Sequence, residues 1–132
     1  PTVTATATAT PTPTPTPTFD RAQYSIDDPA SIWVVVNKLR PLQPAGYVPP
    51  DLRVARIDAT QDLPMRDATA TAAEAMFADA AAAGLPLRLT SAYRSFESQT
   101  RINAQLVQQL GQERADIASA RPGHSEHQTG FA

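Results

Sequence analysis

The chain contains no cysteine among its 132 residues, so it can form neither a disulfide framework nor a thiolate metal site. Any transition metal must therefore be held by imidazole and carboxylate groups. The chain also has no cluster of Lys and Arg, and its formal net charge is -2, whereas a nucleic-acid or anionic-membrane surface needs a concentrated positive field. No apolar run reaches the roughly 18 residues that a membrane-spanning helix requires. We therefore expect no nucleic-acid partner and no membrane insertion within this chain.

The first 18 residues alternate Thr with Ala and then Thr with Pro, which leaves no aliphatic cluster to bury. Fully extended as polyproline II, at about 3.1 Å per residue, they would span at most roughly 55 Å. This length suits a tether to a membrane or through a cell wall, and equally a nonspecific interdomain linker. We therefore expect a disordered linker over residues 1–20 and one small domain over residues 21–132. Such stalks are typical of exported proteins, which favours an extracellular or cell-wall location.

The clearest strand candidate is Ile32–Val36, because it is short, β-branched and aromatic. Prolines and Gly46 then interrupt residues 39–52, which predicts an irregular loop draped over the domain. Residues 53–57 could form a second short strand. Four apolar side chains should pin the loop: Leu42, Tyr47, Val48 and Leu52.

The alanine-rich segment from Asp67 or Thr69 to Ala83 predicts a first helix, with Asp67 as its cap and Gly84 at its end. Two large apolar side chains on this helix are expected to anchor the core: Met76 and Phe77.

Residues 85–91 alternate apolar and polar side chains and therefore predict a strand. A second helix is expected over residues 96–110, ended by Gly111, and a short helical turn over residues 113–118. The buried stripe of the second helix should consist of Ile102, Leu106, Val107 and Leu110. Together these elements predict an α+β fold, with a small, largely antiparallel sheet and helices packed on it.

Arg94 follows the expected strand 85–91 at its C-terminal end, where side chains tend to face a cleft. A guanidinium there could bind a substrate carboxylate or neutralise charge on a scissile carbonyl. The alternative is a surface arginine paired with Glu97 or another acid. Four neighbouring polar side chains are weaker candidates for contacts with substrate: Ser91, Tyr93, Ser95 and Gln99.

His127 is the main metal-ligand candidate, because a neutral imidazole is the usual nitrogen ligand of zinc. Its neighbours Ser125, Thr129 and Gly130 would let a tight strand present the ring. A lone histidine is more often structural, so the pattern by itself leaves both roles open. His124 could join a metal pair only if the loop brought both rings together.

Two motifs carry a family resemblance. The segment Ser91-Ala92-Tyr93-Arg94-Ser95, together with Ser125-x-His127-x-x-Gly130-x-Ala132, resembles the VanY-type zinc D-alanyl-D-alanine carboxypeptidases, whose signature is Ser-x-His-x-x-Gly-x-Ala-x-Asp. The signature Asp would fall two positions beyond Ala132. Upstream, three further segments resemble the opening of VanY-type domains: Val36-Asn37-Lys38, Pro41-Leu42 and Tyr47 to Leu52.

The resemblance implies that His127 is the first ligand of a catalytic Zn²⁺ and that Arg94 is a catalytic and substrate-binding residue. It implies substrate-binding roles for Ser125, with Gln99, Tyr93 and Ser95 as lesser candidates, and it leaves His124 as a bystander. The second and third zinc ligands and the general base of the family have no counterpart in this chain. We therefore expect the chain to be the N-terminal part of such a domain, with C-terminal strands missing, and to be poorly stable and inactive by itself.

The implied substrate is the D-Ala-D-Ala end of a peptidoglycan stem peptide, and we expect a monomer. Two other functions stay open at this stage. A domain that keeps Arg94 without a complete metal site could be a noncatalytic peptidoglycan-binding module. A related zinc dipeptidase or L,D-carboxypeptidase would share the same chemistry and differ in how its cleft treats the rest of the peptide.

Overall fold

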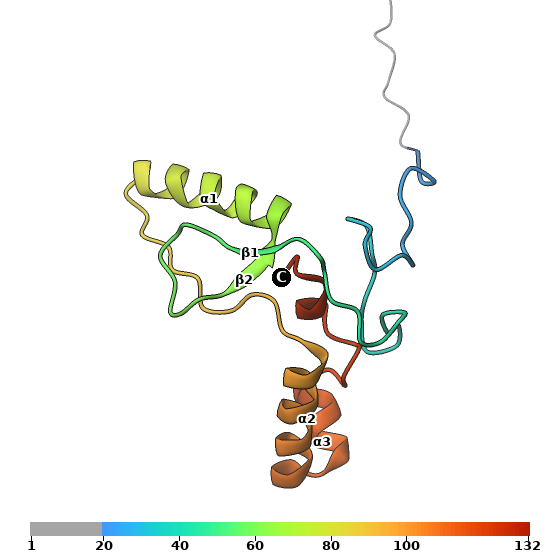
Figure 1. Cartoon of the computed structure of the whole chain (residues 1–132). Coiled ribbons are helices and arrows are strands. Elements are labelled where there is room, and N and C mark those ends of the chain that lie inside the picture. Colours follow the sequence, from blue (N-terminus) through green and yellow to red (C-terminus); the bar gives the residue numbers. More distant parts are fainter. Residues whose placement is uncertain (1–19) are drawn as a thin grey trace, which may run out of the picture.

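The computed structural model describes residues 20–132, so almost all of the expected linker over residues 1–20 lies outside the described residues. The described part contains three α-helices, a two-stranded antiparallel sheet and one 3-10 turn (Figure 1), which confirms the α+β class. In chain order the elements are β1 (Leu52–Val54), β2 (Pro64–Arg66), α1 (Asp67–Ala82), α2 (Phe96–Leu110), α3 (Gln112–Ala118) and η1 (Glu126–Thr129).

The sheet is small, and α1 packs against both of its strands. Leu52 lies opposite Arg66, and Val54 lies opposite Pro64. The second expected strand is therefore present, but it is shifted toward the N-terminus and shorter than residues 53–57. The core between sheet and helix is built from small and medium side chains: Ala55, Leu63, Met65, Ala70 and Ala92, with Ile57, Ala73 and Leu89 packed against them.

Helix α1 begins at Asp67 and ends one residue before the expected Ala83. The N-cap residue is Arg66, which makes no side-chain cap, so Asp67 does not cap the helix. Asp67 lies in the first turn instead, where a carboxylate is stabilised by the helix dipole. Gly84 follows with a φ of 74°, as the glycine stop signal predicted. The role expected for Met76 is wrong, because its side chain is 54% exposed, whereas Phe77 is half-buried.

Two predicted strands are absent from the described residues. Residues Ile32 and Trp33 form a turn, with the Val34 amide donating to the Ser31 carbonyl at 3.2 Å, and residues 34–36 have no regular secondary structure. A β-branched run needs a neighbouring strand for its hydrogen bonds, and none lies beside this one in the described part of the chain. Residues 85–91 are extended but pair only through an isolated parallel bridge between Ala59 and Leu89.

Helix α2 has the bounds that the sequence predicted, and α3 begins one residue earlier than expected. The two helices pack against each other and project away from the sheet (Figure 1). Ser95 caps α2 by accepting a hydrogen bond from the Ser98 amide at 3.2 Å. The expected apolar stripe is only half-buried, and Leu110 is 43% exposed. The fully buried side chain of α2 is instead Gln99.

The irregular loop is present but ends at residue 51, because β1 begins at Leu52, and it is fixed mainly by Leu42, whose side chain is 2% exposed. The Leu42 amide donates to the Gly123 carbonyl at 2.8 Å, so the loop lies against the segment that leads to η1. Tyr47 and Leu52 are half-buried as expected, but Val48 is 56% exposed and does not pin the loop. Among the described residues, no helix combines the length and apolar character needed to cross a membrane.

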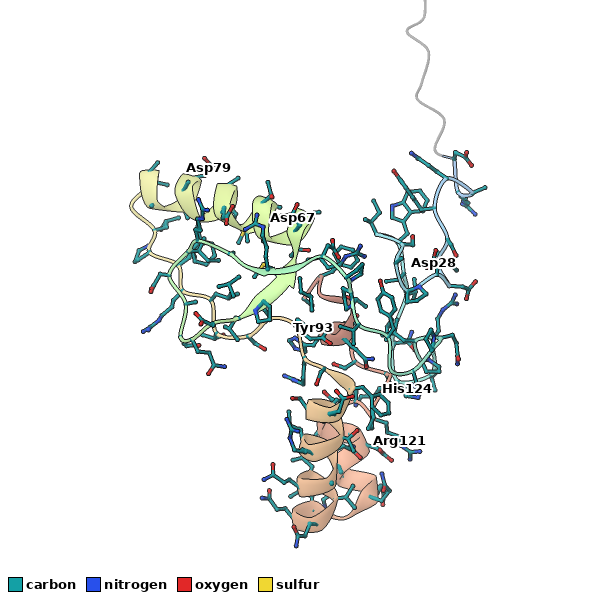
Figure 2. The ribbon with its side chains drawn as sticks, viewed as in Figure 1. Asp28, Asp67, Asp79, Tyr93, Arg121 and His124 are labelled. Atoms are coloured by element: carbon teal, nitrogen blue, oxygen red, sulfur yellow. The ribbon has the colours of Figure 1, made fainter. Side chains whose placement is uncertain are left out.

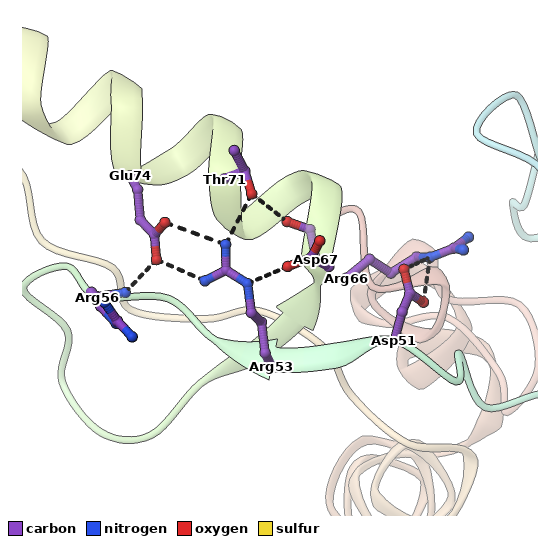
Figure 3. A network of polar contacts seen from close by, with 7 residues as sticks. All are labelled: Asp51, Arg53, Arg56, Arg66, Asp67, Thr71 and Glu74. Atoms are coloured by element: carbon purple, nitrogen blue, oxygen red, sulfur yellow. Dashed lines mark hydrogen bonds and ion pairs between the residues drawn. The ribbon is translucent and has the colours of Figure 1, made fainter.

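A polar network joins β1 to α1 (Figure 3). The Arg53 guanidinium donates to Asp67 at 2.5 Å, to Thr71 at 2.9 Å and to Glu74 at 2.7 Å. The Arg56 amide donates to the same Glu74 carboxylate at 2.8 Å. Hydrogen bonding from Arg53, and then from the Arg56 amide, lowers the pKa of Glu74 from its ordinary value of 4.5 to about 2.

We expect Glu74→Gln to weaken the acid sensitivity of the fold. Because the pKa of Glu74 is lower in the folded chain than in the unfolded chain, its stabilising contribution is present above pH 4.5 and is lost as pH falls toward about 2. In urea unfolding at pH 7, 4 and 2.5, the variant should start less stable and lose less stability on acidification. Asp79→Asn, on the same helix and outside any ion pair of the described residues, is the control. Equal losses in Glu74→Gln and the parent chain would contradict the prediction.

Candidate active site

The two sequence motifs meet beside the sheet. The Tyr93 amide donates to the Pro64 carbonyl of β2, and the next amide, that of Arg94, donates to the His127 carbonyl of η1, both at 3.0 Å. Figure 2 places Tyr93 between the sheet and the start of α2. Residues 92–94 are therefore an extended segment with β2 on one side and η1 on the other.

The His127 ring is fixed by a second bond to the same segment. Its Nδ1 lies 2.8 Å from the Ala92 carbonyl oxygen. A carbonyl oxygen can only accept, so Nδ1 carries a proton, and in the neutral imidazole Nε2 then keeps its lone pair. A backbone carbonyl on the opposite nitrogen is the usual arrangement for a metal-ligating histidine. The ring is half-buried, and it is presented by a 3-10 turn rather than by the tight strand that the sequence suggested.

His127 therefore fits the role of one zinc ligand. Within residues 20–132, no group of three or more His, Cys, Asp or Glu side chains lies close enough together to hold a metal ion. The His124 ring, labelled in Figure 2, does not form a metal pair with His127. Its Nδ1 lies instead 3.1 Å from the carbonyl oxygen of Asn37, just before the irregular loop.

Arg94 is oriented by a buried amide. Its Nη1 donates to Gln99 Oε1 at 3.0 Å. The Gln99 side chain is completely buried, and its Nε2 donates to Ser119 Oγ at 3.0 Å and to the Ala120 carbonyl at 2.6 Å. These acceptors fix the amide so that its oxygen faces the guanidinium.

The surface pairing of Arg94 with Glu97, the alternative considered from the sequence, is not found. Among the described residues, no carboxylate forms an ion pair with Arg94. The pKa of Glu97 is lowered, first by a backbone hydrogen bond within its own residue and then by the Ser95 side chain. The charge of Arg94 is therefore not neutralised by an acid of the described part of the chain.

An open cleft of about 400 Å³ lies along the extended segment. Among the described residues the buried phenol oxygen of Tyr93 has no hydrogen-bond partner, and burial, followed by the charge of Glu97, raises the pKa of this group. Ser95 uses its hydroxyl to cap α2. Ser125 is 5% exposed, and its hydroxyl makes no hydrogen bond with the described residues. The cleft is lined by Gln61, Leu63, Thr90, Ser91, Ala92, Tyr93, Arg94, Ser95, Ser98 and Ile102.

The motif glycine, Gly130, is required by both conformation and space. Its φ is 75°, and a Cβ built on it would lie 2.8 Å from Arg66 Cγ and 3.2 Å from Leu52 Cδ2. The Arg66 amide donates to the Gly130 carbonyl at 3.0 Å, and the Arg66 guanidinium lies 4.8 Å from the centre of the Phe131 ring. The residue that follows η1, Gly130, is therefore packed directly against Arg66 of β2.

Sequence reasoning missed two residues of this site. Arg66 holds the end of η1 and also forms an ion pair with Asp51 at 2.9 Å. Gln128, next to His127, is completely buried. A polar residue inside a loop motif carries no periodicity that would mark it as buried, and only its position beside the histidine could have drawn attention to it.

The model of the VanY family, described as D-alanyl-D-alanine carboxypeptidase, matches residues 62–132. The chain belongs to this family. YodJ of Bacillus subtilis (strain 168), a carboxypeptidase by name, is 36% identical over an alignment of 112 residues that covers 82% of this chain and 41% of YodJ.

Two solved structures share the fold. The LdcB LD-carboxypeptidase has a TM-score of 0.73 and 36% identity, covering 77% of this chain and 50% of that chain. A vancomycin-resistance D,D-pentapeptidase VanY variant in complex with Zn(II) has a TM-score of 0.57 and 24% identity, covering 74% of this chain and 56% of that chain. The chain therefore spans about half the length of these proteins and of YodJ.

We expect Gly130→Ala to destabilise the chain more than Gly84→Ala does. Both glycines have nearly the same positive φ, 75° and 74°, so both substitutions carry the left-handed backbone penalty of about 1–2 kcal/mol. Only at position 130 would the new Cβ also collide with neighbouring atoms, because nothing lies within 4 Å of the Cβ position at residue 84. Urea unfolding should show an additional loss of roughly 1–3 kcal/mol for Gly130→Ala. Equal losses would refute the steric role of Gly130.

Proposed function

We propose that the full-length protein carrying this chain is a zinc-dependent D-Ala-D-Ala carboxypeptidase that trims peptidoglycan stem peptides. The observation that carries this proposal is the pairing of His127 with the 92–94 segment. The ring bonds the Ala92 carbonyl through Nδ1, and the His127 carbonyl accepts from the amide of Arg94, whose charge no carboxylate of the described residues neutralises. Membership of the VanY family supports the same reaction. The Zn(II) complex of the VanY fold relative supports the choice of metal.

In this proposal His127 holds the metal through Nε2, while its Nδ1 proton stays on the Ala92 carbonyl. A bound Zn²⁺ would supply Lewis-acid polarisation of the scissile carbonyl and a water of lowered pKa. The remaining ligands and the general base are not provided by the described residues. The part of the reaction that this chain performs is therefore to orient one ligand and to bind the substrate.

Arg94 is the proposed anion-binding residue. Its guanidinium can make a bidentate contact with the terminal carboxylate or stabilise the oxyanion, and Gln99 acts through it by fixing the guanidinium from the buried side. Ser125 is proposed as a substrate-binding hydroxyl, because it has no hydrogen-bond partner among the described residues. Tyr93 and Ser95 line the cleft and are lesser contributors to substrate binding.

A second candidate is L,D-carboxypeptidase activity on the shortened stem peptide. The similarity to the LdcB LD-carboxypeptidase favours it, because that fold matches with a TM-score of 0.73. Both reactions hydrolyse a terminal D-alanine amide and need the same metal and anion site. A noncatalytic peptidoglycan-binding module is a third possibility, which retains the role of Arg94 and dispenses with the metal.

We further propose that the protein acts as a monomer outside the cytoplasmic membrane, at the cell wall. Family membership supports a wall-directed site of action. In this proposal residues 1–20 form the linker that tethers the domain over residues 21–132. Proteolysis of the purified full-length protein at the Thr/Pro-rich segment, with the domain left intact, would support the division.

We expect the full-length protein to release D-alanine from a muramyl pentapeptide and to lose this activity with a zinc chelator. Arg94→Ala should lower kcat/KM by about 100-fold or more, the range seen when one oxyanion donor is lost. Arg94→Lys should restore little, since an ammonium cannot form the bidentate contact. The rate of D-alanine release from pentapeptide and tetrapeptide separates the D,D from the L,D activity.

The matched control is Arg114→Ala, which removes an arginine from the exposed surface of α3 outside the cleft. Its activity should equal that of the parent protein. A full-length protein that binds muropeptide through Arg94 but releases no D-alanine from either peptide would instead establish the binding module.

A further inference from the structure

Gln128 is a completely buried amide that follows the proposed metal ligand. Its Nε2 donates to the Ala45 carbonyl at 2.6 Å and to the Tyr47 carbonyl at 3.1 Å. Both acceptors belong to the irregular loop that ends at residue 51, called the proline-rich loop from here on. They lie more than 80 residues earlier in the chain. The amide thus connects the turn that carries His127 to a loop with no regular secondary structure.

The orientation of this amide is determined by its partners. Reversing it would place Oε1 against two carbonyl oxygens, which have no hydrogen to share, so the nitrogen must face the loop. Oε1 is buried and has no hydrogen-bond partner among the described residues. All of the bonding of this side chain therefore goes through Nε2 to the loop.

The loop and the residues just before it contact the same segment at two further points. The Leu42 amide donates to the Gly123 carbonyl at 2.8 Å, and a Cβ built on Gly123, whose φ is 80°, would lie 3.3 Å from Ala45 Cβ. The His124 ring lies 3.1 Å from the Asn37 carbonyl oxygen. Residues 37–47 therefore form a support for residues 123–128.

η1 has only four residues, and a 3-10 turn of that length has little stability of its own. Its position must come from its contacts on either side. On one side the 92–94 segment binds the His127 ring and carbonyl. On the other side Gln128 binds the loop.

We propose that Gln128 is a positioning residue that fixes His127 Nε2 by anchoring η1 to the proline-rich loop, and thereby sets the metal affinity of the site. This inference rests on the proposed function, since it takes His127 as a metal ligand. Gln128 itself touches neither metal nor substrate. Its effect is transmitted through the adjacent peptide bond to the His127 backbone.

The test is Gln128→Met in the full-length protein, a change that keeps the length of the side chain and removes both donors. Outer-shell partners of metal ligands typically contribute 10- to 100-fold to metal affinity, so the Kd for Zn²⁺ in a chelator competition should rise about 10-fold or more. The visible absorption spectrum of the Co²⁺-substituted protein should change as well, because it reports the ligand geometry directly. Gly123→Ala, which disturbs the same loop contact from the other side, should change both measurements in the same direction.

Two controls separate positioning from general stability. Gln112→Met makes the same chemical change on the exposed surface of α3 and should leave the Kd unchanged. Ala70→Gly weakens the buried face of α1 and should lower the melting temperature without altering the Kd or the Co²⁺ spectrum.

The possible results discriminate between the two proposals. An unchanged Kd and spectrum in both Gln128→Met and Gly123→Ala, with a parent protein that binds Zn²⁺, would overturn the role of Gln128 and leave the proposed function intact. Equal weakening by Ala70→Gly would also overturn it, as a mere stability effect. A parent protein that binds no metal would overturn the proposed function itself.

Discussion

The site depends on two hydrogen bonds between residues 92–94 and His127. One joins the Arg94 amide to the His127 carbonyl, and the other joins the His127 ring to the Ala92 carbonyl. The first bond sets the register between the two motifs. The second selects the Nδ1-protonated tautomer of the neutral ring, in which Nε2 keeps its lone pair. A displacement of η1 by one residue would break both bonds at once, so the arginine and the histidine cannot be placed independently of each other.

This register is enforced from outside the site. Gly130 lets η1 end against Arg66 and Leu52 without a collision, and Arg66 in turn contacts Asp51, the Ala30 carbonyl and the Phe131 ring. The motif glycine is therefore a packing requirement rather than a chemical participant. The loop on the opposite side is held by Gln128. Because η1 is short, these flanking contacts replace the internal hydrogen bonds that would stabilise a longer element.

Local signals predicted the helices well and the strands poorly. Gly111 predicted the end of α2 correctly, since a glycine stop acts within one turn; the capping role of Ser95 at its start was seen only in the structure. A strand needs a distant partner, and Ile32–Val36 has none among the described residues. At the site, the family resemblance suggested His127 and Arg94, whereas the residue pattern by itself left their roles open. The pattern could not predict that Gln99 and Gln128 are buried, because their partners lie about 20 and 80 residues away in the sequence.

Gln99 and Gln128, the two buried glutamines, make the same kind of contact, and this contact explains how irregular backbone can surround the site. Each amide donates to loop carbonyls that have no partner in a helix or sheet, Ala120 for Gln99 and Ala45 for Gln128. Both glutamine side chains are completely buried, and a buried amide donor without an acceptor is costly, so each loop carbonyl holds its glutamine in place. One glutamine then offers its oxygen to Arg94, and the other lies one peptide bond from His127. The backbone around Arg94 and His127 can therefore leave regular structure, while both residues remain fixed from the buried side.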